Sequence, residues 1–151
     1  MNFLEEVFSV VVKVDTPIVV GQDDIVGRRQ LIPIISGEFT SKDQHGIVLP
    51  GGVDSQIIRP DGTCELSARY AVRLDDGTSF YIENNGIRTV PSEYVELVKN
   101  GKFVDPSLYY FCTTPKFEVY SENLKWLTKS IFTCKATRFP DSVELKFYSI
   151  N

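Results

Sequence analysis

Hydrophobic and polar residues alternate along most of the chain, and this period of two predicts β-strands. The alternation is strict from Thr63 to Leu74, where five apolar side chains share one face and polar side chains such as Glu65 and Arg69 share the other. A half-buried strand is expected there. The next residues predict a hairpin turn over residues 75–77, because Asp and Gly tolerate positive φ, and an antiparallel strand returning over residues 78–88.

Most of the remaining sequence shows strand signals too, since runs rich in β-branched and aromatic residues end at Gly, Pro or Asp. One stretch differs. Pro91–Gly101 is typical of a helix, with Pro91 suited to the first turn and Gly101 to the C-terminal end. The other expected strands cover residues 7–14, 28–40, 46–50, 53–59, 108–114, 125–139 and 142–150.

About eight or nine antiparallel strands with one short helix predict an all-β fold. Strands joined by short turns pair as neighbours, and so many of them must close or stack to cover their edges. An antiparallel β-barrel, or a strongly curved sandwich, satisfies this constraint, and an eight-stranded barrel encloses either packed side chains or one small ligand. With 151 residues, the chain is long enough for one barrel domain over residues 1–151 without disulfides or metals.

The charge of the chain argues against nucleic acid as a partner. The formal net charge is −4, and the 16 basic residues are scattered and outnumbered by 20 acidic ones. Binding to a polyanion needs Lys and Arg gathered on one face, because release of counterions from the phosphates drives the affinity. No nucleic-acid partner is therefore expected.

Cysteine spacing and the N-terminus point to a reducing compartment. Cys64, Cys112 and Cys134 are widely spaced and form no Cys-x-x-Cys pair, which excludes a zinc knuckle or a thioredoxin-type site. Glu5 and Glu6 stand where a signal peptide would carry positive charge, and no apolar run approaches the ~20 residues of a membrane span. We expect a cytoplasmic protein with no membrane contact, no metal and no other cofactor.

The stretch LPGGVDSQIIRPDGT, residues 49–63, contains paired glycines ahead of a carboxylate. A phosphate-binding loop would need these glycines to lead into a helix, but here they lead into a predicted strand. Asp54 follows the turn and shares a strand face with Gln56 and Ile58. The sequence leaves two alternatives open: Asp54 points into a cavity as a base or ligand anchor, or it points outward and caps the turn.

Two further polar residues stand out. Asn84 shares a face with Phe80 and Ile82, so if that face is buried its amide must be satisfied or used. His45 is the only histidine, and no nucleophile motif accompanies it, which argues against a catalytic triad.

Three stretches carry a family resemblance: GRRQLIPIISGEF, GIVLPGGVDSQIIRPDGTCELSARYAVRLDDGTSFYIENNGIR and YYFCTTPKFE. They resemble the bacterial and fungal family called domain of unknown function 3237, or uncharacterised protein family 0311, and the likeness runs from Phe8 to Ile150. The resemblance implies an antiparallel barrel similar in outline to allene oxide cyclase and dirigent-type barrels, which hold a small, largely apolar molecule. The family pattern usually has Trp where Ser55 stands and Arg where Cys112 stands.

Residues and resemblance together predict a small-molecule-binding barrel, with a cyclase or isomerase acting by acid/base steering as the leading hypothesis. The alternative is a non-catalytic ligand-binding protein or an oligomeric scaffold, and a homo-oligomer is compatible with both. In the leading hypothesis a carboxylate and a tyrosine transfer a proton while Arg and Asn donors hold an oxyanion or carboxylate. The expected catalytic residues are Asp54, Tyr70 and Tyr110, and the expected ligand-binding residues are Arg28, Gln56, Arg69, Tyr81, Asn84 and Arg88.

Overall fold

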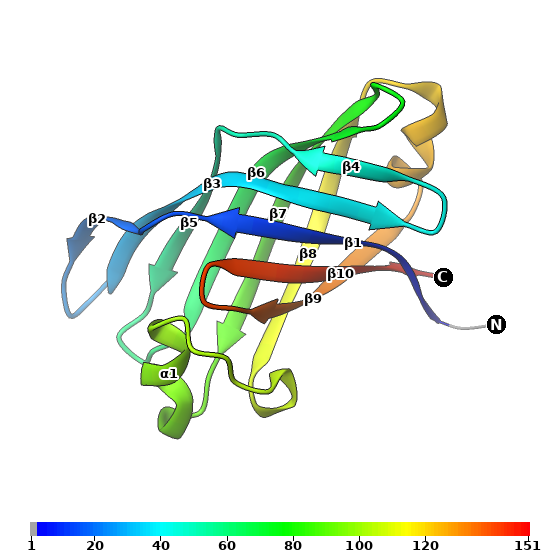
Figure 1. Cartoon of the computed structure of the whole chain (residues 1–151). Helices are drawn as coiled ribbons and strands as arrows, with labels where there is room; N and C mark the ends of the chain where they lie inside the picture. The colour runs from blue at the N-terminus through cyan, green and yellow to red at the C-terminus, as the bar shows by residue number, and fades with distance from the viewer. Residues whose placement is uncertain (1–2) are drawn as a thin grey trace.

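The computed structural model describes residues 3–151, which form an antiparallel β-barrel with one short α-helix (Figure 1). The predicted all-β barrel is therefore confirmed, and the sheet has ten strands. They are β1 (Leu4–Val14), β2 (Ile18–Gln22), β3 (Arg28–Ser41), β4 (His45–Val48), β5 (Gly52–Ile58), β6 (Cys64–Leu74), β7 (Ser79–Thr89), β8 (Tyr110–Val119), β9 (Ile131–Arg138) and β10 (Ser142–Ile150).

Eight positions around the ring close the barrel. Strand β1 completes it because it pairs with β10 on one side and with β3 on the other, so that Val10 lies opposite both Leu145 and Phe39. Strands β4 and β5 share one position, since both lie between β3 and β6. Strand β2 pairs with β3 alone and extends the sheet outside the ring.

The elements between strands differ from the predicted ones. The α-helix α1 covers only Val95–Lys99 and follows a 3₁₀ turn, η1 (Ser92–Tyr94), within the longer predicted helix. A further 3₁₀ turn, η2 (Pro106–Leu108), precedes β8. The strand predicted from residue 125 begins only at β9, because η3 (Glu122–Thr128) is a 3₁₀ helix whose buried Leu124 and Leu127 are three residues apart. Within residues 3–151, no helix has the length and apolar character needed to cross a bilayer.

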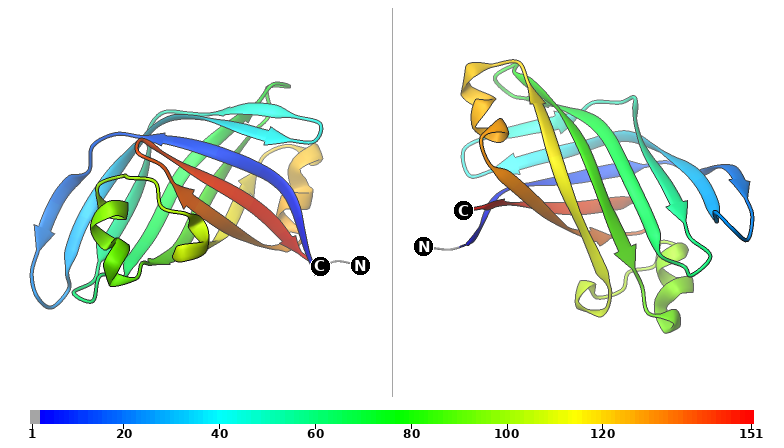
Figure 2. Two further views of the ribbon diagram at one scale, coloured as in Figure 1. Left: turned by 60° about the horizontal axis from the view of Figure 1, so that its bottom comes forward. Right: turned by 180° about the vertical axis from the view of Figure 1, so that it is seen from behind.

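Packed aromatic rings close one end of the barrel. Phe8 lies at their centre, with its ring centroid 4.6 Å from that of Phe147 and 4.9 Å from that of Phe39. This aromatic plug lies at the end covered by η3, whereas α1 lies at the opposite end (Figure 2). The other rings of the plug are Phe80, Phe117, Phe132 and Trp126.

The close approach of β5 to β6 requires a glycine at position 52. A Cβ on Gly52 would lie 2.7 Å from the Tyr70 Cβ and 2.7 Å from the Arg69 carbonyl oxygen. Glycine therefore allows β5 to pack against β6 where the large Tyr70 ring points into the barrel. The glycines of the loop before β5 are explained by this packing and by the positive φ of Gly51.

We predict that Phe8→Ala lowers the free energy of unfolding by about 3–5 kcal/mol, because the cavity it leaves lies among rings that cannot all relax. Phe8 is 3% exposed. Chemical denaturation monitored by far-UV circular dichroism measures the change. The matched control is Phe3→Ala, whose ring is 68% exposed and should cost less than 1 kcal/mol. Similar costs for both variants would contradict the role of the plug.

Candidate functional site

A cavity of about 550 Å³ opens at the α1 end of the barrel. This volume is within the range of small-molecule sites in proteins. Its rim is formed by the segment after β2, the β5–β6 turn and α1, and its wall by inward-facing residues of the strands. The polar and charged residues of the inner wall are Arg28, Gln30, Gln56, Cys64, Arg88 and Arg138.

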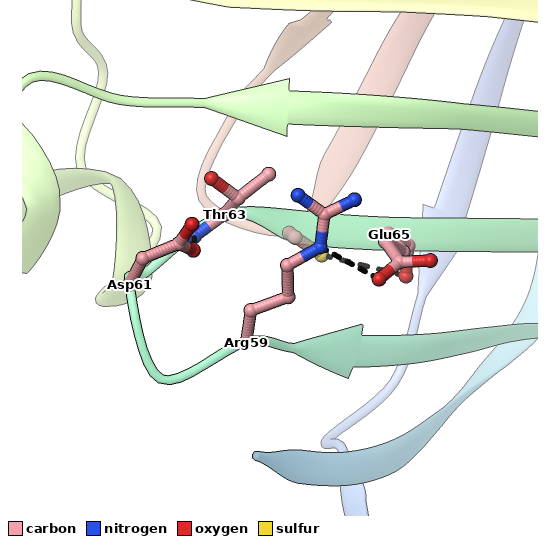
Figure 3. Close-up of polar contacts among 5 residues, drawn as sticks. Arg59, Asp61, Thr63 and Glu65 are labelled. Atoms are coloured by element: carbon pink, nitrogen blue, oxygen red, sulfur yellow. Dashed lines mark hydrogen bonds and ion pairs between the residues drawn. The ribbon is translucent and has the colours of Figure 1, made fainter. Parts of the chain in front are cut away.

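The β5–β6 turn is fixed by its own polar contacts (Figure 3). The Arg59 Nε donates to the Glu65 Oε2 at 2.7 Å, and the Asp61 Oδ1 accepts from the Thr63 backbone N–H at 2.9 Å. That backbone hydrogen bond holds the pKa of Asp61 below its usual value. These groups shape the rim and lie at or near the surface, so they position the wall rather than reach the interior.

Asp54 points into the barrel, which decides between the two alternatives left open by the sequence. It lies opposite Ala68 on β6, and Asn84 on β7 lies opposite the same alanine from the other side. Because the Ala68 side chain is small, Asp54 and Asn84 line one inner cavity of about 30 Å³ together with Tyr70. That volume holds about one water-sized group.

The Asp54 carboxyl lines the inner cavity and is linked to the outer one by a chain of hydrogen bonds. Its Oδ2 accepts a hydrogen bond of 2.8 Å from the Gln56 Nε2, and the Gln56 Oε1 accepts one of 2.8 Å from the Gln30 Nε2. Gln56 and Gln30 both line the outer cavity. The Asp54 Oδ1 is buried and has no hydrogen-bond partner of normal geometry.

Burial raises the pKa of Asp54 above its usual value. The hydrogen bond from Gln56 and the charges of Arg88 and Arg138 oppose this rise but do not cancel it. A carboxyl group in this environment holds its proton to higher pH than an exposed aspartate does. Asp54 is thereby suited to proton transfer closer to neutrality.

Three arginines of the cavity have no carboxylate partner. The guanidinium of Arg88 lies 5.4 Å from the centre of the Phe111 ring, and the Arg138 Nε donates to the Val98 carbonyl oxygen at 3.2 Å. The Arg28 Nε is buried without a hydrogen-bond partner. The ion pairs among residues 3–151 are Arg59–Glu65, Arg69–Glu83 and Lys125–Glu122.

Polar groups deep in the barrel are buried and incompletely paired. The Tyr70 hydroxyl has no hydrogen-bond partner, and the Asn84 amide and the Thr113 Oγ1 make no hydrogen bond of normal geometry. Asn84 and Thr113 do lie against the Cys134 thiol, and these contacts partly oppose the rise of its pKa. Burial raises the pKa of Tyr70 well above its usual value, so the hydroxyl keeps its proton and remains a donor. Unsatisfied buried polar groups are costly, which is why they call for a functional explanation.

The two inward-facing cysteines are poor nucleophiles. Burial raises the pKa of Cys64 to about 11 and that of Cys134 to about 12. Both thiols are therefore protonated near neutral pH, and the thiolate is the reactive form. Among residues 3–151, no three His, Cys, Asp or Glu side chains gather as a metal site would require. The only histidine, His45, is exposed.

Three residues predicted for the site lie on the outer face instead. Arg69 pairs with Glu83 at 3.2 Å, Tyr81 is exposed, and Tyr110 is 57% exposed. Each of them is next in sequence to an inward-facing residue. Because successive side chains of a strand point to opposite faces, each points away from the cavity. The structure thus places the other predicted residues on the inside in two groups. Arg28, Gln56 and Arg88 line the outer cavity, and Asp54, Tyr70 and Asn84 line the inner one. The hydrogen bond between Gln56 and Asp54 joins the two groups.

Sequence reasoning missed several residues of the cavity, of which Arg138 is the most consequential. It shares the inward face of β9 with Phe132, Cys134 and Ala136, so period-two alternation was a usable signal. The sequence predicts one long strand over residues 125–139, but Arg138 is not among the predicted site residues. Gln30 was missed although it lies two residues from Arg28 on the same face.

Comparisons with known proteins agree with this fold. A family model described as "Protein of unknown function (DUF3237)" matches residues 3–150. A UPF0311 protein of Clostridium acetobutylicum is 66% identical over 151 residues, which is 100% of this chain and 95% of the relative. The crystal structure of a conserved protein of unknown function from Rhodopseudomonas palustris is 38% identical with a TM-score of 0.94, covering 98% of this chain and 97% of that one.

A more distant likeness concerns the fold alone. The crystal structure of an enzyme from Penicillium herquei has a TM-score of 0.73 at 18% identity and covers 98% of this chain and 93% of that one. The barrel architecture is thus shared with at least one enzyme.

We predict that Asp54→Asn changes the pH dependence of stability. The folded pKa of Asp54 is raised, so the folded protein binds the proton more tightly than the unfolded chain, whose aspartate pKa is about 3.9. Wild-type stability therefore falls as pH rises from that value to the folded pKa, by up to about 1.4 kcal/mol per pH unit, while the variant lacks this loss. Urea denaturation of both proteins from pH 4 to pH 8 measures the difference, and a constant difference would contradict a raised pKa.

Proposed function

The chain belongs to the DUF3237 family of proteins of unknown function, and from the geometry of its barrel we propose that it binds a small molecule and acts on it as a cyclase or isomerase. Asp54 transfers the proton in this proposal. The substrate occupies the outer cavity, whose apolar wall includes Ile32, Ile58 and Val98. Its reacting end reaches the Asp54 carboxyl beside Gln56, the outer-cavity residue to which Asp54 is hydrogen-bonded.

One observation carries the proposal: an inward-facing carboxyl oxygen without a hydrogen bond of normal geometry, on the wall of the inner cavity. A carboxylate kept only for structure would be expected to have its oxygens fully satisfied by backbone N–H groups or by an ion pair. The Asp54 carboxyl makes no ion pair with residues 3–151, and its only backbone contact there, with Ser67, is a minor influence on its pKa, while Gln56 holds the Oδ2 in place. The side chain is thus oriented by one oxygen and available through the other.

The neighbouring donors support a proton transfer. When Asp54 removes a proton from a substrate carbon or hydroxyl, negative charge develops on a substrate oxygen. The Tyr70 hydroxyl and the Asn84 amide can donate hydrogen bonds to that oxygen in the inner cavity. Return of the proton from Asp54 to another substrate atom completes an isomerisation. In a ring closure, the oxygen adds to one carbon of a C=C bond, the π electron pair of that bond passes to the other carbon, and Asp54 returns the proton there. The substrate neither gains nor loses electrons.

A non-catalytic role is the second candidate, and one surface feature favours it. Strand β2 and the loop after it expose apolar side chains, including Ile18, Val20 and Ile25, the last of which is 87% exposed. Because β2 pairs only with β3, its other edge is open to a second strand. This alternative describes a ligand carrier or scaffold that forms homo-oligomers. Its free thiols fit a cytoplasmic location.

We predict that the protein promotes hydrogen exchange at a carbon of its substrate in a manner that depends on Asp54. A small-molecule extract of the source organism is incubated with the protein in D₂O and is then examined by mass spectrometry for compounds that gain deuterium. Wild-type protein should label specific compounds, and Asp54→Asn should lower their labelling at least 100-fold, as expected for loss of a general base. Native mass spectrometry of the same samples gives the oligomeric state and any ligand retained.

The matched control is Asp43→Asn, because Asp43 is exposed and lies on the β3–β4 connection. It should label the same compounds at the wild-type rate. If native spectra show a retained ligand but neither wild type nor variant produces labelling above the blank, the carrier alternative replaces the enzymatic one.

A further inference from the structure

We propose that the ligand of the barrel carries a carboxylate group, and that Arg88 and Arg138 bind this group between the cavity wall and α1. The inference rests on the proposed function, since it names the class of molecule that the same cavity takes. It adds Arg138, which lies outside the residues expected from the sequence.

Two like charges inside a cavity require an anion. Arg88 and Arg138 both line the outer cavity and are close enough that each opposes the charge of the other. Burial and the charge of Arg88 lower the pKa of Arg138 below its usual value. Taking cations out of water without a partner is unfavourable, and two neighbouring guanidinium groups add repulsion to that cost. A bound anion removes both penalties.

No carboxylate among residues 3–151 forms an ion pair with Arg88 or Arg138. Asp24 and Glu96 line the cavity but are exposed to solvent. Asp54 acts on both arginines through its charge, but its ordered oxygen accepts from Gln56 and it makes no ion pair with either. Asp23, on the rim of the same cavity, is engaged by its own loop, because its Oδ1 accepts hydrogen bonds from the backbone N–H groups of Ile25 and Val26.

Both guanidinium groups are held in place with donors to spare. Phe111 supports the face of the Arg88 guanidinium, and the Val98 carbonyl of α1 accepts from the Arg138 Nε. The terminal N–H groups of Arg88 and Arg138 make no hydrogen bond to residues 3–151. Planar guanidinium groups of this kind match a carboxylate in shape and bind it through paired hydrogen bonds.

The wall beside the two arginines favours an organic acid. Arg88 and Arg138 line the same cavity and offer planar donors that match a carboxylate in shape. The apolar part of the cavity, formed by Ile32, Ile58 and Val98, receives the body of the molecule. The ligand class is therefore a small, largely apolar organic acid.

Matched acids and amides test this inference. Binding of benzoate, cinnamate and 2-naphthoate is compared with binding of benzamide, cinnamamide and 2-naphthamide by ligand-observed NMR titration, at constant salt and pH 7. For the wild-type protein, the best acid should bind at least about tenfold more tightly than its amide, as hydrogen bonds to a charged group imply. Arg88→Gln should reduce this ratio to about one without changing the affinity for the amide.

Arg138→Gln should reduce the ratio in the same way. If Arg138→Gln unfolds because it loses its contact with α1, Arg88→Gln still tests the inference. The control is Arg73→Gln, on the outer face of β6, where the Arg73 Nε donates to Ser79. It should leave the ratio unchanged. A ratio reduced as much by Arg73→Gln as by Arg88→Gln would mean a general effect of net charge and would overturn the inference.

Two other outcomes separate this inference from the proposed function. Equal affinity of acids and amides for wild-type protein would overturn carboxylate recognition and leave small-molecule binding intact. Binding of no member of the panel at millimolar concentration would overturn the inference, while the deuterium labelling with Asp54→Asn tests the proposed function separately.

Discussion

The packing of aromatic rings around Phe8 is the interaction on which the rest of the barrel depends. The interior of an eight-stranded barrel is narrow enough for side chains to fill it completely. An open cavity therefore exists only in the part of the barrel where the side chains leave space. Here the rings of Phe39, Phe80, Phe117 and Phe147 fill the η3 end, and the polar residues begin beyond Tyr70. Large apolar burial at one end offsets the cost of unsatisfied polar groups at the other. The packed η3 end therefore provides much of the stability, and the opposite end holds the candidate site.

The polar half of the interior combines a carboxyl group that is only partly hydrogen-bonded with arginines that have no ion-pair partner among residues 3–151. Asp54 is held by Gln56 but keeps one oxygen unpaired, while Arg88 and Arg138 carry charge without a partner. A protein under selection for stability alone would be expected to satisfy these groups or replace them with apolar side chains. Their joint presence along one cavity is a stronger indication of a ligand than any single residue would be.

Much of the fold follows from period-two alternation, and so does part of the site. The pattern around Tyr70 and Asn84 predicts strands β6 and β7 and groups each side chain with apolar neighbours on one face, and the structure shows that both faces are buried. The direction of Asp54 could not be predicted, because which face of β5 is inside depends on pairing with β3 and β6. Tyr110 was assigned to the site as a motif residue, yet it lies outside because its neighbour Phe111 takes the inward position. Arg138 lies within the predicted strand over residues 125–139, but it has no place in the quoted motifs and only the pairing of the strands shows that its face lines the cavity.

The opening of the outer cavity beside α1 and the β5–β6 turn also has a kinetic consequence for the proposed enzyme. Substrate and product would occupy the same cavity, so the product would have to leave before the next substrate binds. Such a product would act as a competitive inhibitor, and its release would be among the steps that limit turnover.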